Sequence, residues 1–242
     1  MSTFEHDLTK GNIWKQLVKF AVPFFISNLI QSLYSLIDLI ILGHFGGTNS
    51  ISAANIGGQV LVILTNLAAG LAGGGTVMIG NYLGSKQKDK INGTISTLLI
   101  TLMVMAAVFM VLLFIFEHPL LRLLDTPDEA YSQAGQYMFI CSLGLLFIYG
   151  YNALSAIMRG LGDSRTPMIF VIIACAINII LDLVLVAGFH MGAGGAAFAT
   201  IFAQGCSMLF CILYLKRHDF MFDFRYSSFH FVKEEFHTLL RT

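Results

Sequence analysis

Long apolar runs dominate the chain, and short polar connectors separate them. Six runs reach about 18 residues or more, the length that a helix needs to cross the hydrocarbon core of a bilayer. They cover roughly residues 16–43, 54–80, 94–116, 133–157, 167–189 and 194–215. The pattern therefore predicts an all-α membrane protein in which residues 1–217 form one bundle of six transmembrane helices.

The last part of the chain, residues 218–242, has a different pattern of apolar and charged positions. Five apolar side chains there fall on one face of a helix, and the charged side chains lie elsewhere around it: Phe229, Val232, Phe236, Leu239 and Leu240. Such a helix is expected to lie in the plane of the membrane interface. A loosely structured tail is the alternative for this segment.

Composition excludes an ordinary soluble domain. Hydrophobic residues make up 56% of the chain and charged residues 12%, and this charged fraction is about half of that in an average soluble domain. A soluble fold of this size cannot bury so much apolar surface, whereas lipid does not require it to be buried. The four cysteines all lie in apolar runs without metal-ligand spacing, so we interpret them as helix-packing residues.

Basic residues gather in alternate connectors. Thirteen of the 14 Lys and Arg residues precede the first run or lie in its first turn, lie between runs two and three or between runs four and five, or follow run six; the exception is Arg122. Cytoplasmic loops of membrane proteins carry an excess of Lys and Arg. The bias therefore predicts that both termini are cytoplasmic, which agrees with an even number of spans.

Two acidic residues, Asp38 and Asp182, lie inside apolar runs, where a carboxylate costs at least a few kcal/mol. Each precedes the outer end of its run by five or six residues, and Thr200 follows the outer end of the sixth run by a similar distance. At 1.5 Å per residue, all three lie roughly 8–9 Å below the outer end of their helices. Asn178 lies one turn deeper than Asp182 on the same face. The sequence therefore predicts that these four residues converge on one site.

Carboxylate, amide and hydroxyl oxygens make a site that suits protons or hard cations such as sodium. A low dielectric and a neighbouring negative charge both favour the protonated form of at least one of the two carboxyl groups. The alternative is that each aspartate caps a neighbouring helix or pairs with a hydroxyl group. No nucleophile motif, zinc motif or Cys/His cluster is present, so we predict neither an enzyme nor a bound cofactor.

Further polar residues inside the runs include Gln31, Tyr34, Tyr137 and Asn152. They are candidates to extend the ion site or to line a substrate cavity; taken singly, each also fits a hydrogen bond between neighbouring helices. Pro23 removes a backbone hydrogen bond inside the first run and is expected to kink that helix. The kink serves either packing or the bending of a moving helix.

Five segments, in order along the chain, carry a family resemblance. They are PFFISNLIQSLYSLIDLIILGHFGG (23–47), NYLGSK (81–86), RGLGDSRTP (159–167), NIILD (178–182) and GAAFAT (195–200). Together they resemble the multidrug and toxic compound extrusion (MATE) transporters, in the prokaryotic branch with the DNA-damage-inducible and archaeal members. Those proteins have two six-helix bundles and expel cationic, amphipathic compounds in exchange for protons or sodium.

The resemblance implies that this chain is the amino-terminal bundle of such an antiporter in a prokaryotic cell membrane, with residues 218–242 as the linker and the second bundle absent. It also implies an ion site formed by Asp38, Asn178, Asp182 and Thr200, with the backbone carbonyl of Ala196. The resemblance also implies that Gln31, Tyr137 and Asn152 extend the polar network or line the substrate cavity. It implies that Pro23 is the point at which the first helix bends.

The implied partners are a cationic small molecule, the lipid bilayer and a complementary six-span half, without nucleic acid. A lipid-linked sugar flippase of the same superfamily is one alternative, and a non-transporting truncated membrane subunit is another. Flippases of that kind line their cavity with basic residues, whereas no run interior here contains Lys or Arg. This difference favours a cationic substrate.

Overall fold

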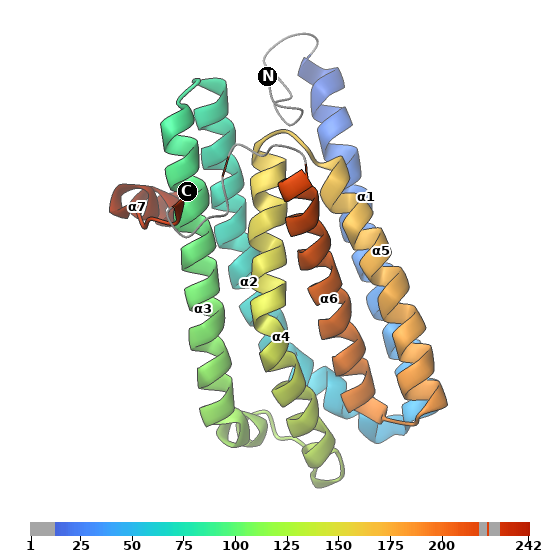
Figure 1. Ribbon diagram of the computed structural model, residues 1–242. Coiled ribbons are helices and arrows are strands. Elements are labelled where there is room, and N and C mark those ends of the chain that lie inside the picture. Colours follow the sequence, from blue (N-terminus) through green and yellow to red (C-terminus); the bar gives the residue numbers. More distant parts are fainter. Residues whose placement is uncertain (1–12, 218–221, 223–227) are drawn as a thin grey trace.

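The computed structural model describes residues 13–217, 222 and 228–242, and these residues are almost entirely helical (Figure 1). The other residues of the predicted linker, 218–221 and 223–227, lie outside the described part. The elements, including two π-helical segments η1 and η2, are α1 Ile13–Ile41, η1 Leu42–Gly46, α2 Gly47–Gly84, α3 Lys88–Leu123, α4 Asp128–Gly160, α5 Arg165–Asp182, η2 Leu183–Gly188, α6 Gly192–Arg217 and α7 Lys233–Arg241.

Six long segments form the bundle, although the first two are joined without a loop. Five stretches of continuous helix are long and apolar enough to cross a membrane, and the first of them, Trp14–Gly84, combines α1, η1 and α2. This stretch folds back on itself (Figure 1) at Gly47, where φ is +79°, a conformation that glycine adopts without strain. With α1 and α2 as separate segments, the all-α bundle with six spans agrees with the prediction.

Helix α4 forms the centre of the bundle. In the most apolar window of α4, 67% of the residues are buried, against 33% or less in the other candidate spans. Small residues allow this close packing: the Cα of Gly144 faces Ile201 on α6, and that of Gly160 faces Ile79 on α2. In lipid, where no hydrophobic effect draws helices together, such close backbone approach stabilises helix pairs.

Helix α1 lies at the edge of the bundle and packs mainly against α5. Much of its apolar surface is exposed, including Leu29, Leu33, Leu36 and Ile40. Pro23 lies inside α1, which remains helical on both sides of it. One turn after it, the Ser27 hydroxyl donates to the Pro23 carbonyl at 2.8 Å.

A tight turn connects α4 to α5 and orients the helix that carries half of the predicted ion site. Gly162 adopts φ +93°, and one oxygen of the Asp163 carboxylate then accepts the N–H groups of Arg165 and Thr166, each at 3.0 Å. These bonds satisfy donors at the start of α5 that have no helical partner. Pro167 follows in the first turn, where its missing N–H costs nothing.

Candidate functional site

The carboxyl groups of Asp38 on α1 and Asp182 on α5 meet near the end of the bundle where η1 and η2 lie. Their side chains lie close enough to interact with each other. Asp182 is fully buried and Asp38 is half-buried. Two carboxyl groups at close range share a hydrogen bond only when one of them carries a proton, so the arrangement suits a proton or a cation in its place.

Asn178 and Thr200 complete the cluster from α5 and α6. Of the two orientations of the Asn178 amide, one satisfies both of its ends: the nitrogen donates to Asp182 Oδ2 at 3.1 Å, and the oxygen accepts the Thr200 N–H at 3.2 Å. Asn178 is 1% exposed. The amide therefore links α5 to α6 directly beside the carboxyl pair, and the four residues predicted to converge lie together.

Two oxygens in this cluster lack a partner among the described residues. Oδ1 of Asp38 and Oδ1 of Asp182 are both buried and accept no hydrogen bond from the described part of the chain. A buried acceptor without a donor costs about 1–3 kcal/mol. A proton or a sodium ion would satisfy these oxygens, and the oxygen-rich donor set suits either.

Both helices that carry an aspartate change their winding shortly after it. η1 starts four residues after Asp38, and η2 starts immediately after Asp182. π-helical turns widen the helix and are frequent at functional sites. The two segments contact each other, and a small apolar cluster packs there, formed by Ile41, Leu42, Val186 and Ala196. Ala196, whose carbonyl was a predicted ligand, is fully buried in this cluster.

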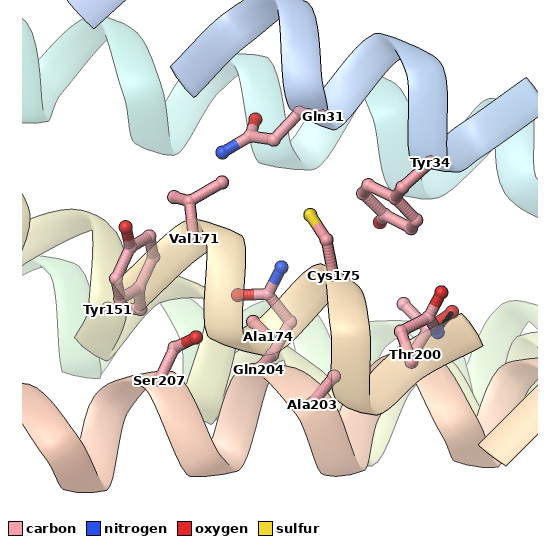
Figure 2. A pocket seen from close by; sticks show the side chains of 11 residues that line it. Gln31, Tyr34, Tyr151, Val171, Ala174, Cys175, Thr200, Ala203, Gln204 and Ser207 are labelled. Carbon is pink, nitrogen blue, oxygen red and sulfur yellow. Dashed lines mark hydrogen bonds between the residues drawn. The ribbon is translucent and has the colours of Figure 1, made fainter. Parts of the chain in front are cut away.

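A small cavity of about 20 Å³, lined by both polar and apolar side chains, lies beside the aspartate pair between α1, α4, α5 and α6. Figure 2 shows Tyr34 and Thr200 at one end, Tyr151 and Ser207 at the other, and Cys175 pointing toward α1 between them. The lining comprises eleven residues: Gln31, Tyr34, Tyr151, Val171, Ala174, Cys175, Asn178, Thr200, Ala203, Gln204 and Ser207. Because Asn178 and Thr200 also belong to the cluster around the two aspartates, the cavity adjoins that cluster.

The structure places the four predicted cavity residues at different points. Gln31 and Tyr34 line the cavity. Tyr137 lies close to Asp38 and Tyr34. Its ring packs against Gly57, so that a Cβ added at Gly57 would lie 3.0 Å from Tyr137 Cδ1. Asn152 donates to the Ile148 carbonyl of its own helix at 2.8 Å. Neither Tyr137 nor Asn152 is among the residues that line the cavity.

Most of the remaining lining residues were not singled out from the sequence, although a helical period marks them. Val171, Ala174 and Cys175 precede Asn178 by seven, four and three positions on α5. Ala203, Gln204 and Ser207 follow Thr200 by three, four and seven positions on α6. Residues at this spacing share a helix face, so extending the face of each ion-site residue inward by two turns would have found them. Tyr151 carries no such signal.

Comparisons with known proteins identify the family to which the chain belongs. The MatE family model matches residues 23–184. The probable multidrug resistance protein YpnP of Bacillus subtilis is 32% identical over 216 residues, which are 88% of this chain and 48% of that protein. The probable multidrug resistance protein NorM of Thermotoga maritima is 28% identical, over 90% of this chain and 49% of that protein. The chain thus spans about half the length of these relatives.

Solved structures give the same result. A multidrug resistance MATE family transporter of the MOP superfamily, solved in an outward-facing conformation, superposes with a TM-score of 0.91 at 26% identity, over 100% of this chain and 54% of that one. A MOP superfamily transporter from Pyrococcus furiosus gives 0.91 at 26%, over 100% and 53%. MatE proteins are transporters, in agreement with the prediction that the chain is not an enzyme. The chain is therefore a multi-pass membrane protein that belongs to the MatE family.

Proposed function

We propose that this chain is the ion-coupling bundle of a secondary antiporter, which exports cationic, amphipathic compounds in exchange for protons or sodium. The observation that carries the proposal is the close approach of the Asp38 and Asp182 side chains, each with a buried oxygen that has no partner among the described residues, beside a small cavity. In this half of the protein the ion site and half of the substrate cavity lie together. The other half of the cavity belongs to a complementary bundle.

In this proposal, the charge of the Asp38–Asp182 pair couples ion binding to substrate binding. Without a bound ion, the carboxyl pair is negative and attracts a cation into the adjoining cavity. A proton or sodium ion at the pair neutralises it and removes that attraction, so that ion and substrate compete for the site. An ion that binds one conformation better than another shifts the populations of the two by its differential affinity. Helix α1 is free to respond because it packs mainly against α5, and Pro23 is its proposed bending point.

The cavity lining favours a cationic rather than an anionic substrate. None of the eleven lining residues is Lys or Arg, whereas a site for a sugar linked to lipid pyrophosphate needs basic groups to meet the phosphates. Hydroxyl, amide and aromatic groups of Tyr34, Tyr151, Gln31 and Gln204 suit an amphipathic cation. The names of the relatives, which are multidrug resistance proteins, support the same substrate class.

The direction of transport follows from the proposed orientation. Lys and Arg gather at the end of the bundle that holds the α2–α3 and α4–α5 connections, and the positive-inside rule makes this end cytoplasmic. The carboxyl pair then lies nearer the outer surface, where external protons or sodium reach it.

The first test measures ion binding by the purified chain. We expect sodium, substituted for potassium at constant ionic strength, to raise the melting temperature of the wild type; saturation at 100 times Kd stabilises by about 2.7 kcal/mol. Asp182→Asn keeps the shape of the side chain and should abolish this response. Glu129→Gln, which neutralises an exposed acid near the outer end, is the control and should respond like the wild type.

The second test measures transport in cells that express the chain together with a complementary six-span bundle. Asp182→Asn should abolish the drug resistance that the wild-type pair confers, without lowering the amount of protein in the membrane. Normal efflux by Asp182→Asn would refute ion coupling at this site. Efflux that follows pH at every sodium concentration would identify the proton as the coupling ion, and the converse would identify sodium.

A further inference from the structure

Helix α7 is held against α2 and α3 by a buried carboxylate that the ion site does not use. The Glu235 side chain is only 8% exposed. The Tyr82 hydroxyl of α2 and the Thr94 hydroxyl of α3 both donate to its Oε2 atom, each at 3.1 Å. Hydrogen bonds to an ionised acceptor are roughly twice as strong as neutral ones. One carboxylate thus fastens three helices together.

The segment just before α7 is also pinned to α3. The Ser96 hydroxyl accepts the His230 N–H at 2.7 Å and donates to the His230 carbonyl at 2.8 Å. The Thr97 hydroxyl accepts the Val232 N–H at 3.0 Å. Ser96 and Thr97 are 0% and 1% exposed. Side chains of α3 therefore replace the helical or sheet partners that this stretch of backbone lacks.

Two glycines allow α7 to approach the bundle closely. A Cβ at Gly74 of α2 would lie 3.3 Å from the Leu239 carbonyl oxygen, and a Cβ at Gly93 of α3 would lie 3.4 Å from Val232 Cγ2. Leu239 is itself 4% exposed. The hydrogen bonds, the buried side chains and the two glycines together define one docking surface on α2 and α3. The segment from His230 onward is therefore an integral part of the fold.

With one face docked, α7 has two faces left, and they differ in chemistry. At 100° per residue, Glu235 and Leu239 point into the docking surface. Phe236 and Leu240 occupy the flank on one side, with Leu240 57% exposed and the Phe236 ring 5.2 Å from that of Phe231. The remaining face is polar and exposed, and it carries Glu234, His237, Thr238 and Arg241.

The position of α7 in the bundle explains the apolar flank. Figure 1 shows α7 crosswise to α3, and it docks beside Gly74–Tyr82 of α2. At the same level the Thr76 hydroxyl of α2 donates to the Ala156 carbonyl at 3.1 Å, and Gly80 faces the Gly160 carbonyl at the end of α4. α7 therefore docks near the end of α2, the start of α3 and the end of α4.

We propose that α7 is a membrane-surface helix, whose partner is the phospholipid interface and whose position depends on Glu235. Phe236 and Leu240 insert below the headgroups, and the polar face remains in water. Lys233, at the border of the apolar flank, reaches the phosphates. The proposal goes beyond the proposed function because it requires neither an ion nor a substrate, and its test measures no transport.

The test compares two spin-labelled positions on α7. A cysteine is introduced at Leu240 or at Thr238 in a chain whose four native cysteines are replaced, and the labelled protein is reconstituted in phosphatidylethanolamine–phosphatidylglycerol vesicles. We expect the label at 240 to be relaxed mainly by oxygen, which concentrates in lipid, and the label at 238 mainly by a water-soluble nickel complex. Equal relaxation by nickel at both positions would overturn the proposal, because the segment would then lie in water.

The role of Glu235 is tested by removing its carboxylate. In Glu235→Ala, the contrast between positions 240 and 238 should disappear, and trypsin should cleave after Lys233 about tenfold faster because the docked state opens more often. Glu234→Ala removes a neighbouring exposed acid and should change neither result. Tyr82→Phe, which removes one donor and leaves the carboxylate, should give an intermediate rate. An unchanged contrast in Glu235→Ala, with wild-type cleavage, would refute the role assigned to this residue.

Discussion

The contact between α4 and α6 at Gly144 offers a quantitative test of how the ion site is supported. Gly144 packs against Ile201, the residue that follows Thr200 on α6. A Cβ added at position 144 would overlap the Ile201 Cγ2 methyl and lie 2.9 Å from Ile201 Cβ. The optimum carbon–carbon separation is roughly 3.5–4.0 Å. Gly144→Ala should therefore push α6 away from α4 beside the bond between Asn178 and Thr200.

The expected cost follows from the stiffness of the neighbour. Ile201 is β-branched and has one strongly preferred rotamer in a helix, so the backbones must separate. Overpacking of this kind costs about 1–3 kcal/mol, and Ala regains up to about 1 kcal/mol of helix propensity over Gly. With Cγ2 and Cβ both obstructed, we expect a net loss of about 2 kcal/mol, which lowers the melting temperature by about 4–8 °C for a chain of this size.

Gly150→Ala on the same helix is the matched control. Its Cβ would meet Met208 Sδ at 2.6 Å and Cε at 2.8 Å, but these atoms end an unbranched, flexible side chain that can move aside. Thermal unfolding of both variants in one detergent should show Gly144→Ala clearly less stable than Gly150→Ala. It should also show partial recovery in Gly144→Ala/Ile201→Ala, which removes the obstructing methyl. If Gly144→Ala melts at or above the wild-type temperature, the packing argument is wrong.

Three further predictions use other parts of the structure. Sodium-dependent stabilisation should fall as the pH is lowered, because protons neutralise the same Asp38 and Asp182 oxygens that would hold sodium; a sodium response independent of pH would place the ion elsewhere. Cys175 lines the cavity, so a bound cationic drug should slow its alkylation at least about tenfold, measured by mass spectrometry with Cys206 as the reference thiol. Ser96→Ala leaves the His230 N–H without its partner and should cost about 1–3 kcal/mol, seen as faster hydrogen exchange of α7 with little change in α4.

The depths of Asp38, Asp182 and Thr200 were predictable because a bilayer gives every spanning helix a common frame. Counting residues from the outer end of each run is then a measurement along one axis. The same count placed Asn178 one turn deeper, where its amide now bridges Asp182 and the Thr200 backbone. A soluble protein has no such common axis, so the sequence would not show that four residues so far apart lie at similar levels.

The rotation of each helix was not predictable in the same way. Tyr137 and Asn152 were expected either to extend the polar network or to line a cavity. Tyr137 lies close to Asp38 and Tyr34, whereas the Asn152 amide donates to a carbonyl of its own helix. Apolar residues that face lipid and apolar residues that face another helix are equally hydrophobic. The hydrophobic period that shows which face of a soluble helix is buried is therefore weak here.

The sequence by itself determined the helical class, the number of spans, the segregation of charge and the level of the acidic residues. Each follows from local composition or from distance along one helix. Only the tertiary structure decided that the two carboxyl groups lie close together, that the cavity continues along α5 and α6, and that α7 docks on α2 and α3 through Glu235. These features depend on which small residues let two backbones approach, and that is a property of pairs of helices distant in sequence rather than of any single run.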